Sequence, residues 1–234
     1  MNVLITGAST GIGRQLASDY AVAGHRVWGS SRSGQAPDHV EALSFDVTSI
    51  EQIESACQSL DSIDLLILNA GGCEYIDDPV NFDAALFKRV IDTNLIGAAN
   101  CLQVLLPKVA CGGRVVFVSS SASFMPLPRA EAYGASKAGL QYLADTLRVD
   151  LAAHSIHVSV VNPGFVETPL TDKNTFDMPF RIPVERASRE IIAGIDKGRM
   201  HIKTPWGFTT ALQWLGALPR FLQHQLALRV RSNT

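Results

Sequence analysis

One stretch near the start of the chain decides its fold: Val3-Leu4-Ile5-Thr6-Gly7-Ala8-Ser9-Thr10-Gly11-Ile12-Gly13. The short apolar run at its head is typical of a fully buried strand, and a helical spacing of apolar residues follows its last glycine. Glycines between a strand and a helix let the backbone approach a phosphate, while the free N–H groups and the positive dipole end of the helix attract the anion. The stretch therefore predicts a dinucleotide site, and the alternative is a tight turn kept only for packing.

The same alternation of strand and helix continues along the chain. The predicted strands cover residues 3–5, 27–31, 42–45, 63–68, 114–118, 156–161 and 200–203. The first predicted helix follows the glycine turn and ends near residue 21. The other predicted helices cover residues 50–60, 82–109 (in one or two pieces), 133–154 and 184–197. Strands that are apolar throughout indicate a parallel sheet with helices on both faces. We expect one doubly wound, Rossmann-like α/β domain of about seven strands over residues 1–203, and a helical C-terminal extension over residues 204–234.

Composition restricts the class of protein. With 47% hydrophobic and 18% charged residues, the chain can bury a large core, and its net charge of −2 offers no basic surface for nucleic acid. The four cysteines form no Cys-x-x-Cys pair and the six histidines show no ligand spacing, so we predict no metal site. No Gly-x-Ser-x-Gly motif points to a hydrolase. Free thiols, no signal-peptide layout and no apolar run of the ~18–20 residues that span a bilayer indicate a cytoplasmic protein.

Polar and glycine-containing turns follow the predicted strands at their carboxyl ends. Ligands of open parallel sheets bind beyond this edge. The turns are Thr6-Gly7, Ser31-Arg32, Asp46-Val47, Asn69-Ala70-Gly71, Ser119-Ser120 and Asn162-Pro163-Gly164. We therefore expect them to line one site.

Arg32 follows the second predicted strand, where dinucleotide-binding folds distinguish their cofactors. An acidic residue at this place binds the ribose hydroxyls of NAD, whereas an arginine accommodates the 2′-phosphate of NADP. Residues 28–33 contain no acid. The pattern favours NADP(H), and the alternative is a solvated surface arginine in a protein that uses NAD(H).

Tyr133 and Lys137 lie four residues apart, so that a helix would place both side chains on one face. A neighbouring ammonium group favours the phenolate, and we therefore expect Lys137 to lower the pKa of Tyr133 from its ordinary value of about 10. Such a pair is common by chance. Its place on the helix after the fifth predicted strand, however, brings it to the same edge as the glycine turn.

Between residues 3 and 168 the chain resembles the classical short-chain dehydrogenase/reductase family. Six motifs occur in the family's order: Thr6-Gly7-Ala8-Ser9-Thr10-Gly11-Ile12-Gly13, Asn69-Ala70-Gly71, Thr93-Asn94, Ser120, Tyr133-x-x-x-Lys137 and Pro163-Gly164-Phe165-Val166-Glu167-Thr168. One position departs from the pattern, because many NADP-preferring members have a basic residue where this chain has Thr10. The preference for NADP(H) thus depends on Arg32 and the missing acid.

The resemblance implies a catalytic role for four residues: Asn94, Ser120, Tyr133 and Lys137. Ser120 would bind the substrate carbonyl, and Tyr133 would exchange the proton. Lys137 would bind the nicotinamide ribose, and Asn94 would hold a water that links Lys137 to solvent. The implied cofactor-binding residues are Gly7, Ser9, Thr10, Gly11, Ile12, Gly13, Ser31, Arg32, Asp46, Val47, Asn69, Ala70, Gly71, Tyr133, Lys137, Pro163, Gly164, Val166 and Thr168.

These residues imply an oxidoreductase that transfers hydride between NADP(H) and a hydrophobic ketone, aldehyde or secondary alcohol. An NAD(H)-dependent dehydrogenase with the same four residues is one alternative, and a non-catalytic dinucleotide sensor is another. The expected substrate pocket lies between residues 72–74, 123–130 and 167–182. Its apolar side chains are Phe124, Met125, Leu127, Phe176, Met178 and Phe180.

The resemblance also implies a homodimer or homotetramer, formed through the helix at residues 82–109 and the helix of Tyr133. The tail from Trp206 has amphipathic spacing, a break at Pro219 and a basic end. We expect this tail to pack on the same domain or on a partner subunit. Docking on a membrane surface is the alternative that its spacing permits.

Overall fold

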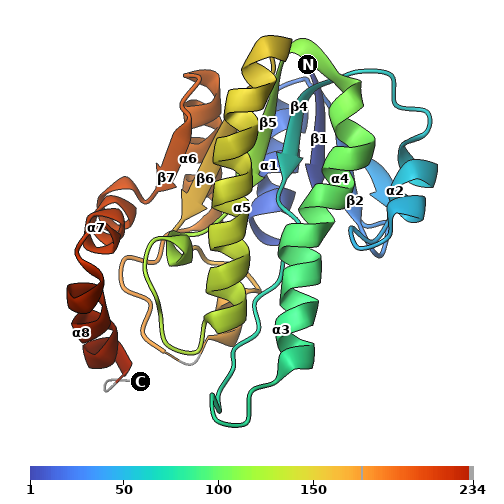
Figure 1. The fold of residues 1–234 in the computed structure, drawn as a ribbon. Helices are drawn as coiled ribbons and strands as arrows, with labels where there is room; N and C mark the ends of the chain where they lie inside the picture. Colours follow the sequence, from blue (N-terminus) through green and yellow to red (C-terminus); the bar gives the residue numbers. More distant parts are fainter. Residues whose placement is uncertain (175, 232–234) are drawn as a thin grey trace.

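The computed structural model describes residues 1–174 and 176–231, which form a seven-stranded parallel sheet in the order β3-β2-β1-β4-β5-β6-β7 (Figure 1). The chain runs outward from β1 to β3 and then crosses to the other side with β4. This reversal creates a switch point between β1 and β4, where the crossover helices leave in opposite directions. The strands are β1 (Asn2–Thr6), β2 (Arg26–Ser31), β3 (Glu41–Ser44), β4 (Ile63–Leu68), β5 (Val109–Val118), β6 (His157–Pro163) and β7 (His201–Thr204).

Helices cover both faces of the sheet. Along β1, Leu4 faces the side of α2, α4 and α5, whereas Val3 and Ile5 face α1 and α6. Because successive strand residues point to opposite faces and both faces are covered, the central strands β1 and β4 have apolar residues at consecutive positions. The predicted doubly wound α/β sheet is confirmed. The helices of this body are α1 (Gly11–Val22), α2 (Ile50–Cys57), α3 (Ala84–Ile91), α4 (Gly97–Leu105), α5 (Glu131–Asp150) and α6 (Val184–Asp196).

The stretch predicted as helix over residues 82–109 is interrupted and ends early. A π-helical turn, Asp92–Ile96, joins α3 to α4, and a 3₁₀ turn, Leu106–Lys108, closes α4 at Pro107. β5 then begins at Val109 and not at the predicted residue 114. Its first residues, which include Gly112 and Gly113, lack the apolar pattern of a strand, so the sequence did not predict them as part of β5.

The same stretch, Ala84–Lys108, qualifies as a membrane span by its length and mean hydropathy, whereas the sequence predicted none. Lys88, Arg89 and Asp92 lie in its first half. α4 packs on the sheet, and α3 packs on α5. The core helices of soluble proteins meet the same criterion. In this stretch 33% of the apolar window is buried, and α4 covers one face of the sheet.

The C-terminal extension forms two helices, α7 (Trp206–Gly216) and α8 (Arg220–Arg231), which lie at the β7 edge of the sheet (Figure 1). α7 contacts β7 and the 3₁₀ turn Ser121–Ser123. The contact is close, because a Cβ at Gly216 would lie 2.2 Å from the carbonyl oxygen of Phe124. The last three residues of the predicted extension, 232–234, lie outside the described residues.

Candidate active site

A cavity of about 570 Å³ opens at the carboxyl edge of the sheet. It extends from Arg32 after β2, past the glycine turn after β1, to Ser120 and Tyr133 beyond β5. The predicted site residues all line this cavity except Gly13 and Asn94. The structure thus brings together turns that the sequence separates by more than a hundred residues.

The glycine turn is shaped by close packing as well as by conformation. Gly7 and Gly11 have positive φ angles of 69° and 56°, which favour glycine. A Cβ at Gly13 would lie 2.3 Å from Asn69 Nδ2 and 2.3 Å from the carbonyl oxygen of Gly7, so no side chain fits there. Gly13 is therefore a packing glycine behind the cavity, which explains why it does not line it.

The start of α1 fits a dinucleotide pyrophosphate. Thr10 is the N-cap residue of α1, but its side chain makes no capping hydrogen bond, and the first turn contains no acidic residue. The N–H groups of this turn are therefore available to an anion at the positive end of the helix. On the opposite wall, Thr168 approaches closely, since a Cβ at Gly11 would lie 3.2 Å from Thr168 Cγ2.

Thr6 and Asn69 bind β1 to β4 directly beneath the cavity. Thr6 Oγ1 accepts hydrogen bonds of 3.0 Å from the N–H groups of Asn69 and Ala70. Asn69 Nδ2 donates to the carbonyl oxygens of Thr6 at 3.0 Å and Gly7 at 3.1 Å. These bonds hold the two strand ends together at the switch point, so the turns that face the cavity keep a fixed shape.

Arg32 lies at the far end of the cavity, where its side chain is exposed and makes no hydrogen bond or ion pair with the described residues. Ser31 beside it donates to the carbonyl oxygen of Gln35 at 2.9 Å, which fixes the turn after β2. Arg32 is thus a cation without a partner among the described residues, and it lies next to a turn whose shape is fixed. This arrangement fits a 2′-phosphate.

Lys137 is buried beneath the centre of the cavity. Its ammonium group donates to the carbonyl oxygen of Val118 at 2.9 Å and lies 5.8 Å from the ring centroid of Tyr133. Burial lowers the pKa of Lys137 to about 8, and a negative charge at Cys73 would counteract this effect. The structure thus confirms that Tyr133 and Lys137 share one face of α5.

The expected lowering of the Tyr133 pKa by Lys137 is wrong for the protein alone. Burial raises the pKa of Tyr133, a thiolate at Cys73 would raise it further, and the hydrogen bond with Ser120 lowers it by less. The cost of taking a phenolate out of water is the largest of these effects, so it decides the sign of the shift. Tyr133 is therefore protonated at neutral pH, as a proton donor must be.

Ser120 is oriented from two directions. Its Oγ accepts a hydrogen bond of 3.1 Å from the N–H of Ala122, so its own proton can point into the cavity, where its hydrogen bond with Tyr133 lies. From behind, the amide of Asn162 donates to the carbonyl oxygen of Ser120 at 3.3 Å and to Gln141 Oε1 at 3.1 Å.

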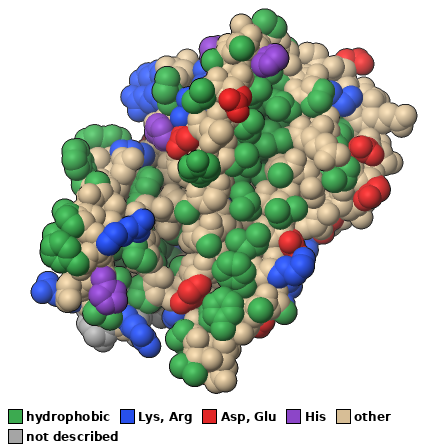
Figure 2. Space-filling model, in the orientation of Figure 1, with side chains coloured by type: hydrophobic (Ala, Val, Ile, Leu, Met, Phe, Trp, Pro, Cys, Tyr) green, Lys and Arg blue, Asp and Glu red, His purple; other side chains and the backbone are tan. Residues whose placement is uncertain are grey.

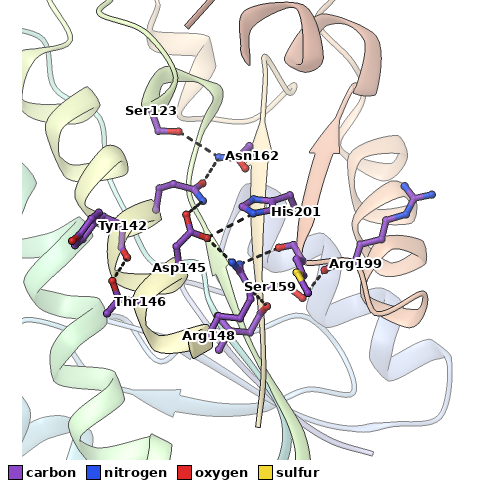
Figure 3. A network of polar contacts seen from close by, with 12 residues as sticks. Ser123, Tyr142, Asp145, Thr146, Arg148, Ser159, Asn162, Arg199 and His201 are labelled. Atoms are coloured by element: carbon purple, nitrogen blue, oxygen red, sulfur yellow. Dashed lines mark hydrogen bonds and ion pairs between the residues drawn. The ribbon is translucent and has the colours of Figure 1, made fainter. Parts of the chain in front are cut away.

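This contact belongs to a polar network that joins β6 to α5 (Figure 3). Asn162 is fully buried, and its amide also lies 3.4 Å from Ser123 Oγ. Gln141 continues the network through a 2.9 Å hydrogen bond to Asp145, which accepts a 2.6 Å bond from Arg148. The sequence placed Asn162 at a strand end, but only the structure shows that it supports the Ser120 turn.

Asn94 lies in the π-helical turn, outside the cavity. Its Nδ2 donates to the carbonyl oxygen of Gly72 and to Ser136 Oγ, both at 2.9 Å, and its Oδ1 accepts from the N–H of Gly72 at 2.8 Å. The side chain therefore holds the turn after β4 against α5. A water held by Asn94 stays a prediction.

Aromatic side chains form a continuous run beside the cavity. Phe176 lies between Tyr75 and Phe165, with ring centroids at 5.8 and 6.1 Å, and Phe208 of α7 lies 5.7 Å from Phe165 and 5.6 Å from Phe180. The sequence identified Phe176 and Phe180 but missed the other three, because they come from outside the expected pocket segments. None of the six apolar side chains expected to line the substrate pocket lines the described cavity.

Several cavity residues were not predicted as cofactor or catalytic residues. Cys73 lies near Tyr133 and Lys137, and burial raises the pKa of its thiol. Cys73 belongs to residues 72–74, which the sequence assigned to the substrate pocket and which all line the cavity. The other lining residues of this kind are Ser30, Phe45, Gly72, Glu74, Thr93, Val118, Ser119, Pro169, Leu170, Thr171 and Lys173.

A phosphate cradle, a cavity at the switch point and a Ser–Tyr–Lys group define a nicotinamide-dependent oxidoreductase. The chain matches the family model described as short chain dehydrogenase over residues 1–178. It therefore belongs to the short-chain dehydrogenase/reductase family, and it is an NAD(P)-dependent oxidoreductase rather than the non-catalytic sensor considered from the sequence.

Among its relatives is an uncharacterized oxidoreductase of Myxococcus xanthus, 34% identical over 97% of this chain and 96% of the relative. The 11-beta-hydroxysteroid dehydrogenase 1A of Arabidopsis thaliana is 28% identical over 94% of this chain and 73% of its own. A short chain dehydrogenase from Burkholderia cenocepacia in complex with NADP has a TM-score of 0.86 at 24% identity and covers 97% of both chains. That likeness shows the fold.

Proposed function

We propose that this protein is an NADP(H)-dependent reductase or dehydrogenase that interconverts a hydrophobic ketone or aldehyde and the corresponding alcohol. The observation that carries the proposal is the position of Ser120, Tyr133 and Lys137 in the same cavity as the glycine turn and Arg32. Bound NADPH would supply the hydride. The fit of Arg32 to a 2′-phosphate supports NADP(H) over NAD(H).

In this proposal each side chain has a distinct task. Ser120 donates a hydrogen bond to the substrate oxygen and so stabilises the negative charge that develops there during reduction. Tyr133 transfers its phenolic proton to the same oxygen, and in oxidation it removes that proton. Lys137, whose ammonium group lies between the Val118 carbonyl and the cavity, stabilises the phenolate that remains.

The aromatic run supports a hydrophobic substrate. Tyr75, Phe165 and Phe176 present ring edges and faces to one another beside the cavity. Rings in such contact bind apolar or aromatic groups with little loss of conformational entropy.

A screen of purified protein against hydrophobic ketones and aldehydes with NADPH tests the proposal. We expect loss of reduced-nicotinamide absorbance with at least one aromatic or alicyclic ketone, and much slower loss with small charged carbonyl compounds. Turnover confined to charged substrates would contradict the substrate class. No turnover with any carbonyl compound or alcohol, despite tight NADPH binding, would contradict the proposed activity.

The pH dependence of reduction should report Lys137. Its ammonium form prevails below pH 8 and its neutral amine above, because burial lowers its pKa to about 8. We expect kcat/KM for reduction to fall as the pH rises through that value, since the charge that stabilises the Tyr133 phenolate is lost. The control is Lys137→Arg, which stays charged: its rate is lower, but the alkaline decline disappears. A parent profile that is flat through pH 8 would contradict this role.

We also propose a homo-oligomer in the cytoplasm. Ile96, Tyr142 and Val149, which lie along the π-helical turn and α5, are exposed apolar side chains on the helices through which family members were expected to pair. All four cysteines are free, which suits a reducing compartment.

A further inference from the structure

Charge is divided unevenly along the chain. After Asp196 no acidic residue occurs, whereas residues 197–234 contain six Lys or Arg and two His. Three of these basic residues, Arg220, Arg229 and Arg231, lie in the C-terminal extension, residues 204–234, which has a formal charge of +3. Residues 1–203 contain the other 17 Lys and Arg and all 22 acids, so the body has a formal charge of −5. The small net charge of the whole protein conceals this division.

The outward side of α8 is apolar. Phe221 is 68% exposed and Leu228 is 45% exposed, and they lie two helical turns apart on one side of the helix. Gln223 is buried on the opposite side and donates to the carbonyl oxygens of Gly216 and Leu218, which fixes α8 against the end of α7. The exposed apolar side chains are therefore held outward by the packing of the other face.

Basic side chains border this apolar row. Arg220 and His224 lie one turn apart, and Arg231 continues the same row at the end of the helix, while Arg229 lies on the other border. α7 also has two exposed indole rings, those of Trp206, 67% exposed, and Trp214, 73% exposed. Figure 2 shows hydrophobic side chains together with basic and histidine side chains over α7 and α8 at the lower left. We call the exposed set of Trp206, Trp214, Arg220, Phe221, Leu222, His224 and Leu228 the outer tail face.

We propose that the outer tail face docks on a membrane surface that contains anionic phospholipid. A helix binds in the plane of such a surface when an apolar row with Trp, Phe and Leu is bordered by basic residues. The indole rings suit the headgroup region, where one side is apolar and the other is wet. Each Lys or Arg near an anionic leaflet adds to the attraction.

Charge complementarity favours lipid over a second copy of this chain. A two-fold interface brings the same surface of both subunits together. The outer tail face contains no acid, so a two-fold contact between two copies would bring Arg220 toward the same face of the partner, which offers it no carboxylate. An anionic leaflet neutralises its charge.

Vesicle sedimentation of the full chain tests the proposal. We expect the protein to sediment with phosphatidylcholine vesicles that contain phosphatidylglycerol, to remain in solution with phosphatidylcholine alone, and to dissociate as salt is raised. Arg220→Glu and the double variant Trp214→Ser/Phe221→Ser should each weaken binding by about tenfold or more. The matched control is Val22→Ser/Val80→Ser, which removes two exposed apolar side chains of the body and should bind like the parent.

Circular dichroism and NADPH affinity, expected to equal those of the parent, show that each variant is folded. Equal sedimentation of the tail variants and the control pair would overturn the proposal, as would equal binding to both kinds of vesicle. Light scattering without vesicles measures the oligomer size and so tests whether the outer tail face is a subunit contact. If the tail variants reduce the oligomer to a smaller species and the parent binds no vesicle, the face is a subunit contact and the proposal is wrong.

Discussion

Tyr133→Phe is expected to lower kcat for carbonyl reduction by about 10²–10⁴-fold, the range associated with a positioned general acid. The substitution removes the phenolic proton but keeps the ring, whose position beside Lys137 is set by α5. Ser120 retains its hydrogen bond from the N–H of Ala122, so the carbonyl can still be held. NADPH affinity, measured by fluorescence titration, should stay close to the parent value.

The matched control is Tyr142→Phe, which makes the same change on the same helix at a side chain that is 78% exposed. It should leave kcat unaltered. Near-normal turnover in Tyr133→Phe would show that another group supplies the proton. A loss of NADPH affinity as large as the loss of kcat would show that Tyr133 serves binding and not proton transfer.

Most of the fold could be predicted from local pattern because both faces of the sheet are covered. The central strands are then apolar runs, such as residues 65–68 at the end of β4, and they end in polar or glycine turns. The start of β5 could not be predicted in this way. Val109 pairs with Ile63 and Arg114 with Leu65, so residues 110–113 lie in an irregularity of the pairing, and their small side chains leave no strand pattern.

The polar edge of the site could also be predicted, because parallel strands place their carboxyl ends together. The sequence could not predict the balance between burial and neighbouring charge that sets the pKa of the Tyr133 hydroxyl. Lys137 suggested a lowered pKa for Tyr133, but the sign depends on how deeply both groups are buried. Burial is a property of the packed chain and not of a spacing of four residues.

Contacts made by remote residues were equally out of reach. Phe208 joins the aromatic run because α7 returns to the body beside Phe165, and Asn162 supports Ser120 from another strand. No local pattern in the tail distinguishes Phe208 from Trp206, which is exposed. The substrate side of the site is formed mostly by such contacts, so the sequence predicted it less well than the cofactor side.

Arg32→Glu is expected to lower kcat/KM with NADPH by about 10²-fold or more, because it replaces a cation beside the 2′-phosphate with an anion. The Arg32 side chain has no partner among the described residues, so its loss breaks no contact of the fold. With NADH, which lacks that phosphate, kcat/KM should change little. The measurement is the ratio of the two kcat/KM values for one substrate.

Arg189→Glu provides the control, since it makes the same charge reversal at an exposed arginine on α6, away from the large cavity. It should leave the cofactor ratio unaltered, and any uniform effect of net charge would appear there as well. An equal loss with both cofactors in Arg32→Glu would mean that the turn after β2 has been disturbed. An unaltered ratio would remove the argument for NADP(H), because residues 28–33 contain no other charged side chain. Thr10 could not supply the preference instead, because this chain lacks there the basic residue that many NADP-preferring family members have.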